Sequence, residues 1–217
     1  MTAARLGSLN EFCWMDLKTR DLPGTGEFFS KALGWRFAVA EDDWRRATGI
    51  TAGRHRIGGV SDLANPTYPP GTPAHIAYYL AVDDVDRRAE AATANGARLV
   101  VPPFDAGDQG RIATLIDPVG AAFSLWQPYG FAGWSFPAGS ARLPHRMVLA
   151  CEQPDLARDF YRGTTGAPLV HADFRTAYEP AAAAPRWELE IGVEDAGPVG
   201  RLSSPEGLSF LLRPLSR

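Results

Sequence analysis

The stretch GRIATLIDPVGAAFSLWQ, from Gly110 to Gln127, decides how the rest of the chain is interpreted. Two short apolar runs flank the DPVG segment at residues 117–120, in which proline presets φ and glycine tolerates a positive φ. The stretch therefore predicts a β-hairpin. Because side chains alternate along a strand, one face of the second strand is purely apolar and should pack on helices. The other face, with Ser124 and Trp126, should look into the space that the sheet encloses.

The composition excludes several classes of function. The chain has 217 residues, an apolar fraction of 45% and a net charge of -3, which leaves no basic surface for nucleic acid or anionic lipid. No apolar run reaches the roughly 20 residues of a membrane-spanning helix, and the first ten residues lack the apolar region of a signal peptide. We therefore expect a cytoplasmic protein with neither a nucleic-acid nor a membrane partner.

The cysteines and lysines give two minor indications. Cys13 and Cys151 have neither metal-binding spacing nor the density of a disulfide scaffold, so we expect buried free thiols. Only Lys18 and Lys31 are lysines among 22 basic residues, which indicates a GC-rich coding sequence and a bacterial source.

The segments before the hairpin alternate between strand and helix patterns. Asp21 and Gly34 are positioned to begin and end a first helix, and Asp84 and Gly96 do the same for a second. The proline-rich segment at residues 65–73 predicts a loop. The expected elements are strands at 11–19, 36–39, 44–50, 55–60, 75–82 and 98–101, and helices at 26–33 and 85–95.

The same landmarks recur after the hairpin at shorter spacing. The aromatic pair at 160–161 with Gly166 repeats the pair at 28–29 with Gly34, and the SPEG turn at 204–207 repeats the DPVG turn. Residues 128–143 have no periodic pattern and predict a linker. We therefore divide the chain into a first βαβββ region with paired repeats over residues 1–127, the linker, and a second, shortened region over residues 144–217 that lacks one helix.

Together these motifs resemble the vicinal oxygen chelate superfamily, which includes glyoxalase I, bleomycin and fosfomycin resistance proteins and extradiol dioxygenases. The resemblance rests on Trp14 to Asp21, Phe28 to Trp35, Tyr79 to Asp86, and Gly110 to Trp126. It covers the first half well and the second half partially. It implies an α+β fold of two tandem βαβββ modules whose curved mixed sheets enclose a small-molecule pocket, with the second module truncated.

The resemblance also indicates where a metal would bind. Family members that use a metal carry His, Gln or Glu on the first, middle and last strands of a module. The corresponding positions are Trp14, Ala77 and Ser124 in the first module, and Arg146, Glu188 and Leu211 in the second. Only Glu188 is suited to coordinate a divalent metal. We therefore expect no metal and no other cofactor, and no direct transfer of glyoxalase or dioxygenase activity.

Aromatic side chains take the place of ligands on the expected pocket face. Such walls suit a planar or apolar ligand, although the same rings could simply fill the barrel as core. The ligand-binding candidates are Phe12, Trp14, Ser124, Trp126, Arg111, Arg146 and Glu188.

Asp16 is the most informative polar residue on this face. A carboxylate there must be paired, for which Arg111 or Arg146 is available, or its pKa rises as in a general base. His75 begins its strand and is either a surface-facing residue or an acid or base. The catalytic candidates are Asp16, His75 and Tyr79.

Glu188 and Glu190 share a face in the second module. We favour two solvated side chains on a face that the shortened module leaves open. If that face were enclosed, the two carboxylates would repel each other, bind a cation or hold a cationic ligand.

Three functions are compatible with these residues. The first is a metal-independent binding protein that sequesters an aromatic or apolar metabolite. The alternative is a metal-independent enzyme of secondary-metabolite biosynthesis or detoxification, in which Asp16 with His75 or Tyr79 transfers protons in an isomerisation, cyclisation or ring-opening. The third is a metalloenzyme with ligands from unexpected positions such as His75 and Glu188. A sheet edge exposed by the missing helix would favour a homodimer.

Overall fold

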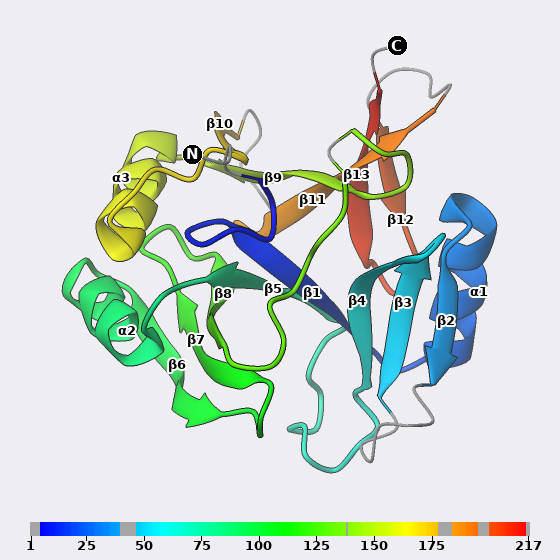
Figure 1. Cartoon of the computed structure of the whole chain (residues 1–217), viewed down its shortest axis with the longest axis horizontal. Helices are drawn as coiled ribbons and strands as arrows, with labels where there is room; N and C mark the ends of the chain where they lie inside the picture. Colours follow the sequence, from blue (N-terminus) through cyan, green and yellow to red (C-terminus); the bar gives the residue numbers. More distant parts are fainter. Residues whose placement is uncertain (1–4, 40–46, 138, 178–183, 195–199, 216–217) are drawn as a thin grey trace. The chain divides into compact units, whose positions relative to one another are not determined.

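The computed structural model describes residues 5–39, 47–137, 139–177, 184–194 and 200–215. Its elements in chain order (Figure 1) are β1 (Phe12–Thr19), α1 (Leu22–Leu33), β2 (Arg36–Val39), β3 (Thr48–Ala52), β4 (His55–Asp62), β5 (His75–Ala81), α2 (Val85–Ala94), β6 (Arg98–Asp105), β7 (Gly110–Ile116), β8 (Ala122–Pro128), β9 (Pro144–Cys151), α3 (Pro154–Thr165), β10 (Ala172–Thr176), β11 (Trp187–Val193), β12 (Gly200–Ser203) and β13 (Ser209–Pro214). Across these ranges, no helix combines the length and apolar character that crossing a bilayer requires.

The fold is α+β with two sheets, as predicted. One sheet has eight strands in the order β2-β3-β4-β1-β5-β8-β7-β6, and the other has five in the order β10-β9-β11-β13-β12. The first sheet is built by two successive βαβββ sets, and the second by the shorter sets β9-α3-β10 and β11-β12-β13. Residues 194–199 separate β11 from β12, and of these the structure describes residue 194 alone, so the expected loss of a helix stays a prediction.

The contacts of the chain group into two compact units, each assembled from both sides of the predicted linker. Unit 1 consists of Met1–Trp14, Tyr78–Trp134 and Arg146–Leu189, and unit 2 of Met15–Ala77, Ser135–His145 and Glu190–Arg217. The strands β1, β5, β9 and β11 therefore contribute residues to both units. The modules at 1–127 and 144–217 are defined by a repeat rather than by contacts, so their boundaries stay a prediction.

The first helix begins earlier than its apolar pattern indicates. The Asp21 side chain caps α1 by accepting from the backbone N–H of Gly24 at 2.9 Å, and Gly34 ends it with φ 66°. The helix starts at Leu22 rather than Gly26 because Pro23 lies in its first turn, where a missing N–H costs nothing. The second helix begins as predicted, with the Asp84 carboxylate accepting from the N–H of Arg87 at 3.0 Å.

The apolar face of the hairpin packs on a helix of unit 1, as predicted. Phe123 on β8 meets the rings of Phe160 and Tyr161 on α3 at centroid distances of 5.9 and 5.1 Å. The α3 helix lies beside α2 (Figure 1). The hydroxyl of Tyr161 donates to Oδ2 of Asp117 at 3.0 Å and accepts from Nε1 of Trp187 at 2.7 Å. The DPVG turn is thereby bonded to elements from the second half of the chain.

The equivalent turn of the second half is bonded to the first half within unit 2. The carboxylate of Glu206 accepts from the Thr19 hydroxyl, from the N–H of Arg20 at 3.2 Å and from the Thr25 hydroxyl at 3.4 Å. Thr25 lies in the first turn of α1. Both repeated turns therefore attach to a helix that the other half of the chain supplies.

Candidate functional site

Four aromatic rings gather in unit 1, and we call them the aromatic cluster: Trp14, Tyr79, Trp126 and Phe131. The Trp14 and Phe131 rings meet edge to face at 4.7 Å and 84°. Trp126 contacts Tyr79 at 6.0 Å and Phe131 at 6.3 Å, both edge to face. Such geometries are favourable beyond the area they bury. Trp126 is buried while the other three rings are half-buried, so the cluster presents an aromatic surface that is accessible in part.

Three different strands position the cluster through their alternation. Trp14 comes from β1, Tyr79 from β5 and Trp126 from β8. In the parallel pair of β5 and β8, Tyr79 lies opposite Ser124, which shares a face with Trp126 two residues later. Three of the side chains that period-two alternation assigned to the inner face of the sheet, Trp14, Tyr79 and Trp126, therefore meet in space.

The fourth ring comes from the predicted linker, through a segment at residues 129–134 that we call the strap. The strap returns to the sheet: the N–H of Phe131 donates to the carbonyl of Gln109 at 3.1 Å, and the N–H of Trp134 donates to the carbonyl of Cys13 at 2.7 Å. The indole Nε1 of Trp126 donates to the main-chain oxygen of Phe131 at 2.9 Å. The sequence analysis did not identify Phe131, although it lies shortly after β8 between glycines at 130 and 133.

Two further candidates in unit 1 are enclosed by protein. The Ser124 hydroxyl is buried and shares a hydrogen bond with the Thr114 hydroxyl at 2.9 Å. Phe12 is fully buried and packs on Trp187 at a ring distance of 4.7 Å. Phe12 therefore belongs to the core of unit 1 and is not accessible to a ligand.

Asp16 lies in unit 2 within a second group, the polar cluster of Asp16, Lys18, Ser61 and Tyr68. The ammonium of Lys18 donates to Oδ2 of Asp16, to the Ser61 hydroxyl at 2.9 Å and to the Tyr68 hydroxyl at 3.1 Å. Ser61 also donates to Oδ2 of Asp16 at 2.7 Å. Burial opposes the charge on Lys18, but the neighbouring carboxylate outweighs it and raises the pKa of Lys18. Asp16 is therefore a paired carboxylate.

The prediction that Arg111 or Arg146 pairs with Asp16 is wrong. Arg111 is held by Asp86, at 2.6 and 2.9 Å, and by Asp105 at 3.0 Å. Arg146 pairs with Asp173 at 2.7 Å. The partner of Asp16 is Lys18, which projects from the same face of β1 two residues later and needs no long-range contact.

The three catalytic candidates do not gather in one unit. His75 is exposed at the start of β5, with Nδ1 2.9 Å from the carbonyl oxygen of Pro73, which agrees with the surface-facing interpretation. His75 and Asp16 belong to unit 2, whereas Tyr79 belongs to unit 1, where its ring packs on Trp126.

The expectation that Glu188 and Glu190 are solvated is also wrong. Their exposed fractions are 8% and 2%. Both lie on β11, which has β9 and β13 as neighbours in the five-stranded sheet and is buried along almost its whole length. Glu188 lies 3.7 Å from an Arg186 nitrogen, and Glu190 lies 3.4 Å from an Arg213 nitrogen. Each carboxylate thus has a cation nearby.

The residues at the family's metal positions do not fit a divalent metal. Trp14 packs on Phe131, Ala77 carries only a methyl group, and the Ser124 hydroxyl is shared with Thr114. Within the ranges that the structure describes, no three His, Cys, Asp or Glu side chains lie close enough together to hold an ion. A divalent metal needs several converging donors, which these positions do not provide.

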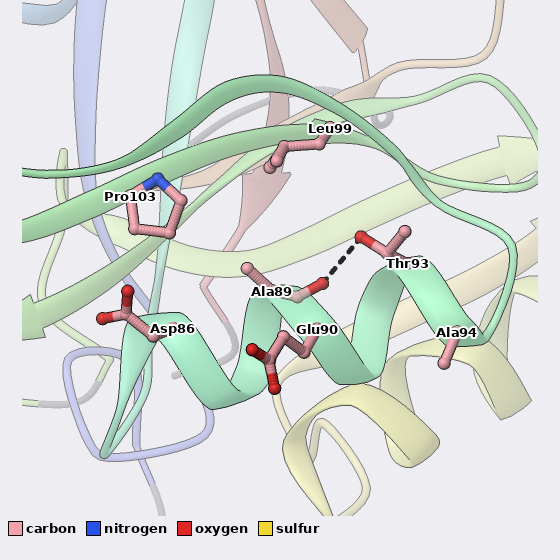
Figure 2. A pocket seen from close by; sticks show the side chains of 7 residues that line it. All are labelled: Asp86, Ala89, Glu90, Thr93, Ala94, Leu99 and Pro103. Carbon is pink, nitrogen blue, oxygen red and sulfur yellow. Dashed lines mark hydrogen bonds between the residues drawn. The ribbon is translucent and has the colours of Figure 1, made fainter.

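A separate cavity of about 470 Å³ lies between α2 and β6 (Figure 2). Figure 2 shows Leu99 and Pro103 on β6 across from side chains of α2. None of the site residues predicted from the sequence lines it. The lining residues are Asp86, Ala89, Glu90, Thr93, Ala94, Leu99 and Pro103.

Comparisons with known proteins agree with this fold. CFP32 of Mycobacterium bovis, a protein named for a glyoxylase, is 31% identical over 168 residues, which cover 76% of this chain and 62% of CFP32. The anthracycline biosynthesis protein DnrV of Streptomyces peucetius is 27% identical over 178 residues, which cover 77% of this chain and 64% of DnrV. The chain therefore spans less than two thirds of the length of these relatives.

Solved structures and a family model give the same placement. The Mn(II)-bound glyoxalase from Novosphingobium aromaticivorans aligns with a TM-score of 0.63 at 14% identity, over 96% of this chain and 83% of that one, which is a likeness of fold. The family model matches residues 12–125, from the start of β1 into β8. The chain belongs to the Glyoxalase/Bleomycin resistance protein/Dioxygenase superfamily.

Proposed function

We propose that this protein binds an aromatic or apolar small molecule at the aromatic cluster of unit 1, without a metal at the positions that the family uses. The observation that carries the proposal is the gathering of Trp14, Tyr79 and Trp126 from three strands, in which Trp14 and Tyr79 are half-buried and Trp126 is buried. Aromatic walls with a few fixed polar groups suit a flat ligand, because rings bury large areas and stack.

The names of the relatives support a role with a secondary metabolite. DnrV and the similar DauV of a Streptomyces strain are both named for anthracycline biosynthesis. A protein that holds an aromatic metabolite in a pocket would serve sequestration or resistance. At the family's metal position on the first strand, Trp14 offers an aromatic wall in place of a metal ligand.

Equilibrium titration followed by tryptophan fluorescence tests this proposal. Aromatic natural products are expected to change the emission of the wild-type protein, and Trp14→Ala is expected to weaken their binding about tenfold or more, since it removes one wall of the site. The matched control is Leu99→Ala, which changes the separate cavity between α2 and β6. Binding that is lost in Leu99→Ala and unchanged in Trp14→Ala would refute the proposal.

A second candidate function is acid-base catalysis at the polar cluster. The observation in its favour is that Asp16, Lys18, Ser61 and Tyr68 form one half-buried hydrogen-bonded group. The Asp16 carboxylate is already occupied by the ammonium of Lys18 and the hydroxyl of Ser61, which favours the binding function. An enzyme would lose turnover in Asp16→Asn while it still bound its substrate, whereas a binding protein has no turnover to lose.

A further inference from the structure

We propose that Phe131 holds the place of a ligand ring, and that the ligand is an aryl carbonyl compound whose oxygen replaces the main-chain oxygen of Phe131. The inference rests on the proposed function and names the ligand class for the same site. It requires the strap at residues 129–134 to withdraw when the ligand binds.

The ring of Phe131 contacts two tryptophans of the sheet. It lies against Trp14 at 4.7 Å and against Trp126 at 6.3 Å, edge to face in both cases. Trp14 and Trp126 are sheet residues, whereas Phe131 is brought to them by the strap. An external aromatic ring that used both tryptophans would have to take the place of the Phe131 ring.

The indole nitrogen of Trp126 is a hydrogen-bond donor that the strap satisfies. Nε1 donates to the main-chain oxygen of Phe131 at 2.9 Å, and the Trp126 side chain is buried. A buried donor that loses its acceptor costs much more than a typical hydrogen bond contributes. A ligand that displaces the strap must therefore bring an acceptor of its own, within reach of its aromatic ring.

The strap is attached to the rest of unit 1 on both sides of Phe131. Its first part is tied by the N–H of Gly130 to the carbonyl of Asp108 at 3.0 Å, and its far end by the N–H of Trp134 to Cys13. Gly133 has φ 91°, and a Cβ there would lie 2.3 Å from the Cys13 carbonyl oxygen, so this end is packed closely on β1. The ring and the carbonyl between these two ties are the groups that a ligand would replace.

An aryl carbonyl compound meets both requirements. Its ring supplies the edge-to-face contacts with the two tryptophans, and its carbonyl oxygen accepts from Nε1 of Trp126. An aromatic hydrocarbon of the same shape supplies only the ring. Affinity for the hydrocarbon is therefore reduced by the donor it leaves unpaired.

The test compares two probes of the same size, 2-acetylnaphthalene and 2-isopropenylnaphthalene, in which a CH2 group replaces the carbonyl oxygen, by fluorescence titration of the full chain. The wild type is expected to bind the ketone at least about fivefold more tightly than the hydrocarbon. Trp126→Phe removes the indole donor and is expected to abolish that preference. Hydrogen exchange at the N–H groups of Gly130 and Phe131 is expected to speed up when the ketone binds to the wild type.

The variant Phe131→Ala tests the inference independently. It empties the ring position while the main-chain oxygen at 131 stays available to Trp126. Both probes are expected to bind about tenfold more tightly, and the preference for the ketone is expected to shrink, because the strap no longer has to move. If the alanine variant does not fold, Phe131→Leu keeps an apolar side chain without a ring, and the same direction of change is expected.

The outcomes separate the inference from the proposed function. Equal binding of both probes by the wild type, or ketone binding with the strap amides still protected, would overturn the inference and leave the proposed function standing. No binding of either probe to the wild type or to the Phe131 variants would overturn both.

Discussion

Replacing Tyr161 by phenylalanine removes one fully buried oxygen atom that serves two partners. That oxygen donates to the Asp117 carboxylate at 3.0 Å and accepts from Nε1 of Trp187 at 2.7 Å. The ring remains, so its contacts with Phe123 at 5.1 Å persist and no large cavity forms. The change therefore isolates the cost of the two lost hydrogen bonds.

The expected loss of stability follows from the two groups, Asp117 and Trp187, that each lose a hydrogen-bond partner. A buried group without its partner costs about 1 to 3 kcal/mol, with charged groups at the upper end. Asp117 keeps its bonds from the N–H groups of Val119 and Ala121, at 3.1 and 2.7 Å, which limits the loss on that side. We expect Tyr161→Phe to lower the free energy of unfolding by about 3 kcal/mol, and the melting temperature by roughly 6 to 12 °C.

The loss should also depend on pH, with a sign set by Asp117. Burial raises the pKa of Asp117, while the Tyr161 hydroxyl lowers it. The folded protein therefore protonates this carboxyl at a higher pH than the unfolded chain does, and its ionised form lowers stability above that pKa. Tyr161→Phe should cost most near neutral pH, and the cost should shrink as the pH falls through the folded-state pKa of Asp117.

Urea unfolding followed by tryptophan fluorescence at several pH values measures both effects. The matched control is Tyr129→Phe, which removes a hydroxyl that donates to Asp105 at 3.0 Å from a side chain with 52% exposure. That control is expected to change the free energy of unfolding far less than Tyr161→Phe does, because the Tyr129 hydroxyl is replaced by water. A loss for Tyr161→Phe no larger than that of the control would refute the reasoning.

Three further predictions concern other parts of the molecule. Gly133→Ala should destabilise by about 2 kcal/mol or more in thermal melts, because its φ is 91° and the new Cβ would clash with β1. Lys18→Met should lower the free energy of unfolding by about 1 to 3 kcal/mol at pH 7, because the pairing with Asp16 is lost. The loss should shrink as the pH rises through the raised pKa of Lys18, since the wild type loses the same pairing there. Urea titrations measure it, with the exposed Lys31→Met as the control. Glu206→Gln should lower the free energy of unfolding by about 1 kcal/mol in urea titrations, since a neutral amide accepts hydrogen bonds more weakly than a carboxylate.

Period-two alternation predicted the arrangement of the first module well. It separated Phe123, which packs on α3, from Trp126, which faces the aromatic cluster. The same alternation places Lys18 on the face of Asp16, although the predicted partners of Asp16 were two distant arginines. Alternation succeeds here because each strand sets its own two faces locally.

The rest depended on tertiary placement that no local pattern contains. Phe131 lies in a segment without periodicity, and only its bonds to Gln109 and Trp126 bring it to the cluster. Glu188 and Glu190 lie on a central strand whose two faces are both covered, and one sequence does not show how much of a truncated module is covered. Long-range packing decides such cases, because the same strand pattern is compatible with an open or a covered face.

A crystal structure of the protein with 2-acetylnaphthalene tests the central claim most directly. We expect the ring of the ketone between Trp14 and Trp126, its oxygen within hydrogen-bond distance of Nε1 of Trp126, and the Phe131 side chain displaced. A ligand found instead in the cavity between α2 and β6, with the aromatic cluster unchanged, would contradict the account.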